Sequence, residues 1–100
     1  TWVACASAVA RVGAVPVLAD IDPGSLCISP DEARTMIGPR TRAILIVHLH
    51  CSLADIDAFL QVSSETGIPL VEDCSHAHGA IWGEGRVGTF GRVGVFSMQN

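Results

Sequence analysis

The chain has 100 residues, enough for one domain, and its ten acids against six lysines and arginines give a net charge of −4. This acidic balance argues against a nucleic-acid interface or a basic membrane-binding surface. The hydrophobic content of 49% is high for a free-standing domain of this size, so we expect further chain or a partner to cover apolar surface. We therefore expect residues 1–100 to be an internal fragment that forms a single incomplete domain.

The four cysteines are Cys5, Cys27, Cys51 and Cys74, and no two of them have the spacing of a CxxC motif. This pattern favours free thiols in a reducing compartment over a disulfide framework. No apolar run reaches the length that a bilayer requires. We expect a cytoplasmic protein.

In the first part of the chain, the sequence predicts a helix, a strand and a second helix. Residues 2–12 are rich in Ala and Val, and Gly13 follows as a C-terminal cap. Residues 15–20 are mostly apolar and predict a strand, with a proline at its start or edge. Residues 29–32, Ser-Pro-Asp-Glu, combine a capping serine, a proline and a glutamate, so they predict a helix that ends near residues 38–39.

The middle and the end of the chain alternate between strand and helix patterns. Residues 43–47 are continuously apolar and predict a strand that is covered on both faces. Residues 52–55 form a second capping box, and apolar residues recur at helical spacing as far as Gly67. Further strands are predicted at residues 68–72 and 93–97. This succession predicts an α/β fold with a mainly parallel sheet and flanking helices.

Residues 80–88 predict a small hairpin that turns at Gly-Glu-Gly. Gly83, Gly85 and Gly88 also satisfy the G-x-G-x-x-G pattern of dinucleotide-binding proteins. However, no strong strand precedes them, no helix follows, and Glu84 is the last acid in the chain. Ordinary loop glycines therefore explain the pattern better than a dinucleotide site.

Asp73 is the most informative residue, because it ends an apolar strand where a carboxylate is costly to desolvate without a partner. In open α/β sheets, the carboxyl ends of the strands are where ligands bind. One interpretation is structural: a helix cap, or a salt bridge to Arg86 or Arg92. The other is a carboxylate that keeps the ring nitrogen of pyridoxal phosphate (PLP) protonated. The residues alone leave both open.

Three other features carry weaker signals. Imidazoles and thiols that suit zinc follow two strands, although the usual ligand spacings are absent: His48, His50, Cys51, Cys74, His76 and His78. Ser97 ends the last predicted strand and either bonds a phosphate or its own local backbone. Trp2 either belongs to a core or offers a flat face to an aromatic ligand.

Ordered blocks along the whole chain resemble the StrS-like sugar aminotransferases, which are fold type I PLP enzymes. The longest block is Glu-Asp-Cys-Ser-His-Ala-His-Gly-Ala at residues 72–80. The other blocks lie at residues 1–9, 13–17, 20–22, 39–44, 54–58, 87–91 and 96–99. The resemblance implies that residues 1–100 are part of the large PLP-binding domain of such an enzyme.

The resemblance also implies roles for individual residues. Asp73 would pair with the pyridinium nitrogen of PLP, and His76 would lie beside the phenolic oxygen of the cofactor. Trp2 would stack on the pyridine ring, and Ser97 would bind the phosphate. The Schiff-base lysine would stand at position 102, beyond Asn100, so we expect no catalytic residue within the chain and no activity from this piece alone.

The blocks at residues 4–9, 26–27, 72–75 and 97–99 most resemble the branch that aminates 2-deoxy-scyllo-inosose or scyllo-inosose with L-glutamine in aminoglycoside antibiotic biosynthesis. The resemblance implies a homodimer with a small-molecule ketone substrate, and no nucleic-acid or membrane partner.

Several alternatives to this activity stay open. Similarity around His76 to 3-amino-5-hydroxybenzoate synthases leaves that activity open within the same family. A PLP-dependent sugar dehydratase, in which histidine replaces the lysine, is a further possibility in the family. A zinc-binding α/β hydrolase or a non-enzymatic binding module would be a hypothesis from another class of protein. Cys51-Ser52 departs from the commonest family pattern, which has Gly first.

Overall fold

The computed structural model describes residues 3–98. A parallel sheet of three strands in the order β1-β2-β5 forms its centre, and a separate antiparallel hairpin of β3 and β4 lies beside it. The elements in chain order are α1 Val3–Arg11, α2 Pro30–Met36, β1 Ile44–Val47, α3 Ile56–Thr66, β2 Leu70–Asp73, β3 Ile81–Trp82, β4 Gly85–Arg86 and β5 Val93–Val95. The predicted α/β fold with a parallel sheet, flanking helices and a hairpin within residues 80–88 is confirmed.

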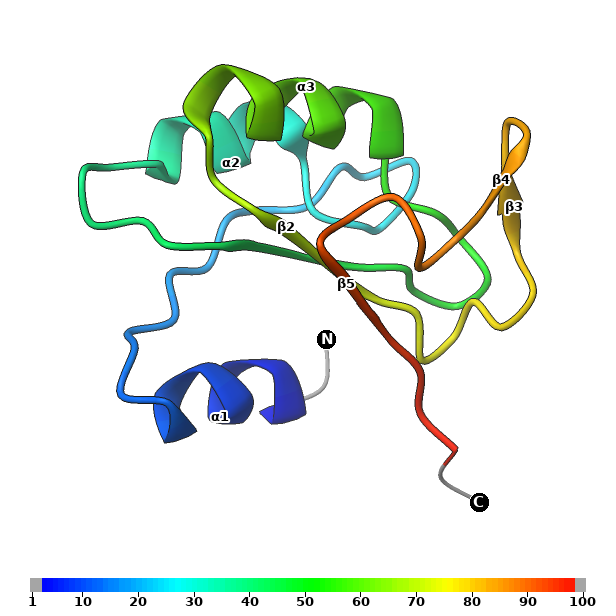
Figure 1. Ribbon diagram of the computed structural model, residues 1–100, viewed down its shortest axis with the longest axis horizontal. Helices are drawn as coiled ribbons and strands as arrows, with labels where there is room; N and C mark the ends of the chain where they lie inside the picture. Colours follow the sequence, from blue (N-terminus) through cyan, green and yellow to red (C-terminus); the bar gives the residue numbers. More distant parts are fainter. Residues whose placement is uncertain (1–2, 99–100) are drawn as a thin grey trace.

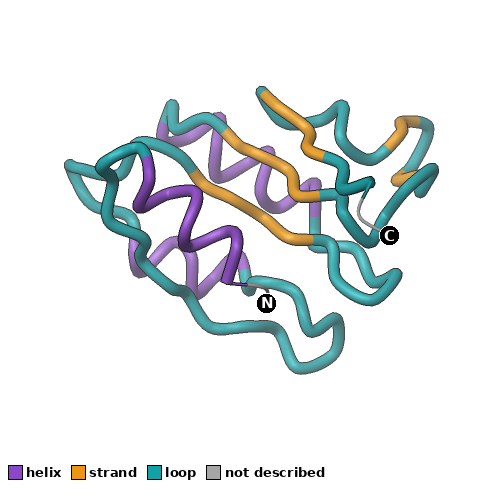
Figure 2. The backbone as a smooth tube through the Cα atoms, turned by 90° about the horizontal axis from the view of Figure 1, so that it is seen from below, coloured by secondary structure: helices purple, strands orange, loops and turns teal. Residues whose placement is uncertain are grey.

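The helices cover the two faces of the sheet unequally. α2 and α3 lie together on one face, and α1 lies on the other (Figure 1). Figure 2 looks at the sheet from the side of α1, the helix next to the N label. Between α3 and the sheet, Ile46, Phe59, Val62 and Leu70 are at most 2% exposed and form the core, whereas α1 has no buried residue. The face toward α1 is therefore the open one.

Local signals explain where the helices begin and end. The Ser29 side chain accepts a hydrogen bond from the Glu32 N–H at 3.3 Å, which confirms the predicted start of α2, although α2 ends at Met36, before the predicted stop. For α3, the predicted cap at Ser52 is wrong. Asp55 caps this helix, because its Oδ1 accepts from the backbone N–H of the third residue after it at 3.0 Å. Gly67 ends α3 at φ 70, in the left-handed region that glycine tolerates.

The strand predicted at residues 15–20 is wrong. These residues have no strand partner in the described part of the chain, and Val15 and Leu18 are 83% and 80% exposed. An apolar, β-branched run predicts a strand only where a neighbouring strand takes up its hydrogen bonds, and Pro16 has no N–H to offer one. The other strand predictions hold with shifts of one or two residues at their ends.

β2 is the central strand, and its register sets the position of Asp73. Asp73 pairs with Val47 of β1 on one side and with Val95 of β5 on the other. All three strands end together here, so residues that follow them meet at one carboxyl edge. Among residues 3–98, no helix has the length and apolar character needed to cross a bilayer.

Candidate functional site at the carboxyl edge of the sheet

Asp73 lies at the end of β2 and on the open face of the sheet. Successive side chains of a strand point to opposite faces, so Asp73 faces α1, whereas Leu70 and Glu72 face α3. The Oδ1 atom of Asp73 accepts from the backbone N–H and the hydroxyl of Ser75, at 3.0 and 2.5 Å. Its Oδ2 atom accepts from the thiol of Cys5 in α1, at 3.1 Å. Both carboxyl oxygens are thus held in place while the residue stays half-buried.

These contacts keep Asp73 ionised. Partial burial on its own raises the pKa of this carboxyl, but the hydrogen bonds from Ser75 and Cys5 outweigh it and hold the pKa below its usual value. Among residues 3–98, neither Arg86 nor Arg92 forms an ion pair with Asp73. The proposed structural salt bridge is therefore wrong, and a half-exposed anionic acceptor is left at the edge of the sheet.

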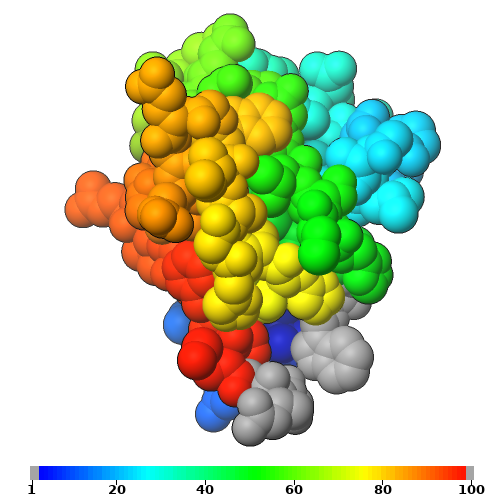
Figure 3. All heavy atoms as spheres, turned by 90° about the vertical axis from the view of Figure 1, so that its right-hand side faces the viewer, coloured from blue at the N-terminus to red at the C-terminus, as the bar shows by residue number. Residues whose placement is uncertain are grey.

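Histidines from two loops gather at the same edge. The backbone N–H of His50, after β1, donates to Nδ1 of His76 at 3.3 Å, and the two rings stack with centroids 5.4 Å apart. His78 lies instead against Phe96, which follows β5, with ring centroids also 5.4 Å apart. Figure 3 shows this side of the molecule, where the green, yellow and red segments around residues 50, 75 and 96 lie next to one another.

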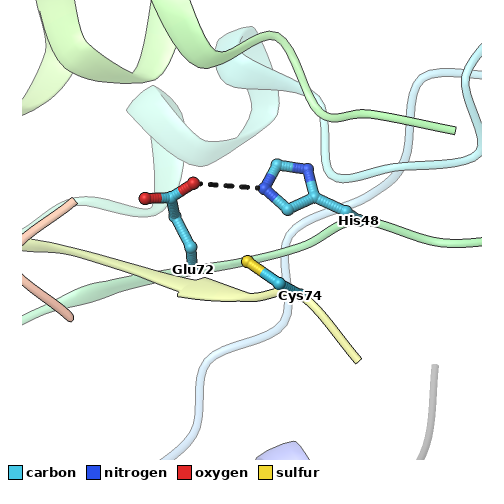
Figure 4. A group of neighbouring side chains, drawn as sticks. All are labelled: His48, Glu72 and Cys74. Carbon is cyan, nitrogen blue, oxygen red and sulfur yellow. Dashed lines mark ion pairs between the residues drawn. The ribbon is translucent and has the colours of Figure 1, made fainter. Parts of the chain in front are cut away.

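A second polar cluster lies behind Asp73, on the buried face. Glu72 is fully buried, and its carboxylate accepts three backbone N–H groups of one loop: Gly88 on Oε2 at 2.8 Å, and Phe90 and Gly91 on Oε1 at 2.8 and 2.6 Å. His48 points toward Glu72, with Nε2 and Oε2 3.5 Å apart, and Cys74 lies beside them (Figure 4). Glu72 therefore fastens the loop before β5 to the central strand.

This cluster does not suit a metal ion, although it is the one group of three or more potential ligands among the described residues whose ligand atoms lie within 4.8 Å of one another. Nδ1 of His48 accepts from the Ala54 N–H at 3.2 Å, so the neutral ring carries its proton on Nε2, the atom a metal would need. If the proton were on Nδ1 instead, that N–H group would face the N–H group of Ala54, and the hydrogen bond between them would be lost. Burial, and then the charges of Glu72 and Asp73, raise the pKa of Cys74 to about 11, which keeps its thiol protonated.

The zinc set predicted from the sequence is also dispersed. Of its members, only His48 and Cys74 belong to the buried cluster, while His50 and His76 stack at the surface and Cys51 is exposed. All the cysteines are free thiols.

The whole chain, residues 1–100, matches the model of the DegT/DnrJ/EryC1/StrS aminotransferase family. The chain belongs to this family. An L-glutamine:2-deoxy-scyllo-inosose aminotransferase from Micromonospora echinospora is 53% identical over 100 residues, which are all of this chain and 24% of that protein. The chain thus spans about a quarter of the length of the curated relatives it matches.

Solved structures that are more than 30% identical to this chain have the same fold. The crystal structure of 3-amino-5-hydroxybenzoic acid (AHBA) synthase superposes with a TM-score of 0.96 at 39% identity, over 100% of this chain and 26% of the other. The ntda protein from Bacillus subtilis, solved with the cofactor PMP bound, superposes with a TM-score of 0.78 at 32% identity, over 81% of this chain and 19% of the other. The DegT/DnrJ/EryC1/StrS family is PLP-dependent.

The four residues that the resemblance assigned to the cofactor are placed unequally. Asp73 and His76 lie at the carboxyl edge, and Ser97 follows β5 by two residues, exposed, at the same edge. Trp2 lies outside the described residues. The roles of these residues toward PLP stay predictions.

Sequence reasoning missed two partners of Asp73. Ser75 was within reach of prediction, because a serine two residues after an aspartate often bonds the aspartate side chain in a turn. Cys5 was not, because it stands 68 residues away in the sequence and thiols are weak donors with no pairing pattern.

Proposed function

We propose that a protein of the relatives' length that carries this chain is a PLP-dependent aminotransferase. It moves the amino group of L-glutamine to a cyclitol ketone, 2-deoxy-scyllo-inosose or scyllo-inosose, in aminoglycoside antibiotic biosynthesis. The amino group and one hydrogen of glutamine go to the ketone carbon, and the ketone oxygen goes to glutamine, which becomes a 2-oxo acid. The 53% identity to the Micromonospora echinospora enzyme supports this substrate over that of AHBA synthase, at 39%.

The observation that carries the proposal is the state of Asp73. It is an ionised carboxylate, fixed by three hydrogen bonds and half-exposed at the carboxyl edge of a parallel sheet. A protonated ring nitrogen is the partner that such an acceptor suits, and PLP carries one. The ionised Asp73 carboxylate therefore fits the cofactor of the family. The buried cluster of His48, Glu72 and Cys74 behind it does not fit a metal ion.

Residues of this chain would hold the cofactor and control one of its protons. Ser75 and Cys5 orient the Asp73 carboxylate, whose negative charge would hold the proton on the ring nitrogen of bound PLP. PLP, when bound, supplies an electron sink for the electrons released at the α-carbon of the amino acid. His76, Ser97 and Trp2 are proposed to contact its phenolic oxygen, its phosphate and its ring face. The lysine expected at position 102 would move the proton between substrate and cofactor.

The family resemblance also supports a homodimer in the cytoplasm whose active sites form between two subunits. Light scattering on the full-length protein measures the number of subunits directly. A monomer that turns over at the full rate would contradict this part of the proposal.

The test of the activity compares Asp73→Asn with Asp57→Asn, a control that changes an exposed acid in the first turn of α3. Both full-length variants are supplied with PLP, L-glutamine and 2-deoxy-scyllo-inosose, and the amine product is measured by mass spectrometry. We expect Asp73→Asn to lower turnover by about 100-fold or more, the scale on which loss of one preorganised stabilising group acts. The control should match the wild type. Equal turnover in both variants, or a purified protein with zinc and no PLP absorbance, would contradict the proposal.

A further inference from the structure

The loop after β1 contains two consecutive residues in the left-handed region of the backbone, and neither is glycine. His50 has φ 50 and Cys51 has φ 63. A side chain at such angles crowds the following carbonyl oxygen, so the conformation costs free energy. Both residues are exposed, so burial in a core does not explain why the loop adopts it. The turn closes on itself through a hydrogen bond from the Ser52 N–H to the Leu49 carbonyl oxygen at 2.8 Å, and it also makes a contact with another segment.

That contact is a hydrogen bond from the backbone of the loop to a side chain of another segment. The N–H of His50 donates to Nδ1 of His76 at 3.3 Å. A neutral imidazole has one N–H donor and one bare acceptor nitrogen. Because Nδ1 is the acceptor, the proton of His76 must be on Nε2.

The ring of His50 restricts His76 further. The two imidazoles stack with centroids 5.4 Å apart and planes inclined by 23°, so both the plane of the His76 ring and its protonation pattern are set by one loop. His78 has no such constraint from this loop, because its ring lies against Phe96 at an angle of 58°. The two histidines of the His-Ala-His sequence thus have different surroundings.

We infer that the turn formed by His50 and Cys51 is a positioning element for His76, which it fixes as the Nε2–H tautomer so that His76 donates a hydrogen bond to an anionic oxygen of the bound ligand. This inference rests on the proposed function for the identity of the ligand. Asp73 offers an acceptor and His76, three residues later, offers a donor. Together they suit a flat heteroaromatic ligand with a protonated ring nitrogen and a deprotonated hydroxyl group on the same ring.

The tautomer can be measured without any ligand. Full-length protein with nitrogen-15 in its histidine rings is studied by NMR over a pH series that extends about two units above the usual imidazole pKa of about 6.5. The His76 signals are assigned by their loss in His76→Gln. We expect the chemical shifts of a single Nε2–H tautomer. Shifts of the Nδ1–H form, or shifts averaged between the two forms, would overturn the inference.

Two substitutions of Cys51 test whether the turn is the cause. Cys51→Gly tolerates the left-handed backbone and keeps the His50 N–H in place, so the single tautomer should persist. Cys51→Val puts a β-branched residue where it is a strong outlier, so the turn should open and the His76 signals should become averaged. A single Nε2–H tautomer in Cys51→Val would show that the turn does not fix it.

The function of the donor is tested by two amide substitutions in the protein loaded with PLP. The amide nitrogen of glutamine reaches the position of Nε2, whereas that of asparagine reaches only the position of Nδ1. We expect His76→Gln to keep the absorbance maximum of the bound cofactor and its pH dependence, and His76→Asn to shift both. Identical spectra for the two variants would overturn the inference. If the wild-type protein binds no PLP, the proposed function fails, while the tautomer measurement still stands by itself.

Discussion

Replacing the buried carboxylate of Glu72 by an amide should release the loop that leads into β5. In the wild type, the two oxygens of Glu72 accept the N–H groups of Gly88, Phe90 and Gly91 at 2.6–2.8 Å. In Glu72→Gln, one oxygen becomes an NH₂ group, so at least one of these backbone donors faces another donor. The side chain is fully buried, and water cannot take over the lost contact.

The size of the effect follows from these contacts. A hydrogen bond to a charged group contributes about 1.5–3 kcal/mol, and a buried donor left without a partner costs about 1–3 kcal/mol. The retained oxygen still accepts one or two N–H groups, so we expect the free energy of opening the loop to fall by about 2–4 kcal/mol. At about 1.4 kcal/mol for each factor of ten, this corresponds to about 30-fold to about 1,000-fold faster amide exchange.

Hydrogen–deuterium exchange of the full-length protein, read from peptides that cover residues 88–91, measures this directly. Glu84→Gln is the matched control, because it makes the same chemical change at an exposed acid of the nearby hairpin. Exchange in the control should equal that of the wild type. If residues 88–91 in Glu72→Gln exchanged within about threefold of the wild type, the carboxylate would not be what holds the loop.

Three further changes follow from the structure and are measured by urea unfolding of the full-length protein. Burial lowers the pKa of His48 from 6.5 in the folded protein. As the pH falls below 6.5, His48 therefore takes up a proton in the unfolded state before it does so in the folded state. The free energy of unfolding should decrease over this pH range. His48→Asn should remove that loss, and an unchanged pH dependence would contradict the assignment. Cys51→Gly should raise stability by up to about 1 kcal/mol, whereas Ser52→Gly, outside the left-handed region, should not. Gly94→Ala should destabilise by more than about 3 kcal/mol, because its Cβ would lie 2.1 Å from a backbone oxygen, whereas Gly38→Ala meets nothing within 4 Å and should be near neutral.

The parts of the fold that the sequence predicted depend on interactions between near neighbours in the chain. Ser29 and Glu32 are three residues apart, and their capping contact needs no information from the rest of the molecule. The strand predicted at residues 15–20 failed for the opposite reason. Its apolar pattern is real, but a strand also needs a neighbour, and no local pattern shows whether one is present.

The candidate site divides in the same way. The need of Asp73 for hydrogen-bond partners was predictable, because a carboxylate at the end of an apolar strand is costly to desolvate without them. The role of Glu72 was not, because its donors follow 16–19 residues later in a loop whose sequence carries no signal for this contact. The His50 contact with His76 was hidden as well, since it depends on a left-handed turn that Gly, rather than His-Cys, would have announced.

Glu72 and Asp73 are neighbours in sequence but serve opposite faces of β2, and this makes the strand intolerant of misalignment. A slip of one residue against β1 or β5 would turn Asp73 toward the core and Glu72 toward the open face. The loop before β5 would then lose Glu72 as its hydrogen-bond acceptor, and the open face would lose Asp73. A chain folded in the wrong register would thus lose the hydrogen bonds of both carboxylates together, so the register of β2 is fixed from both faces of the sheet.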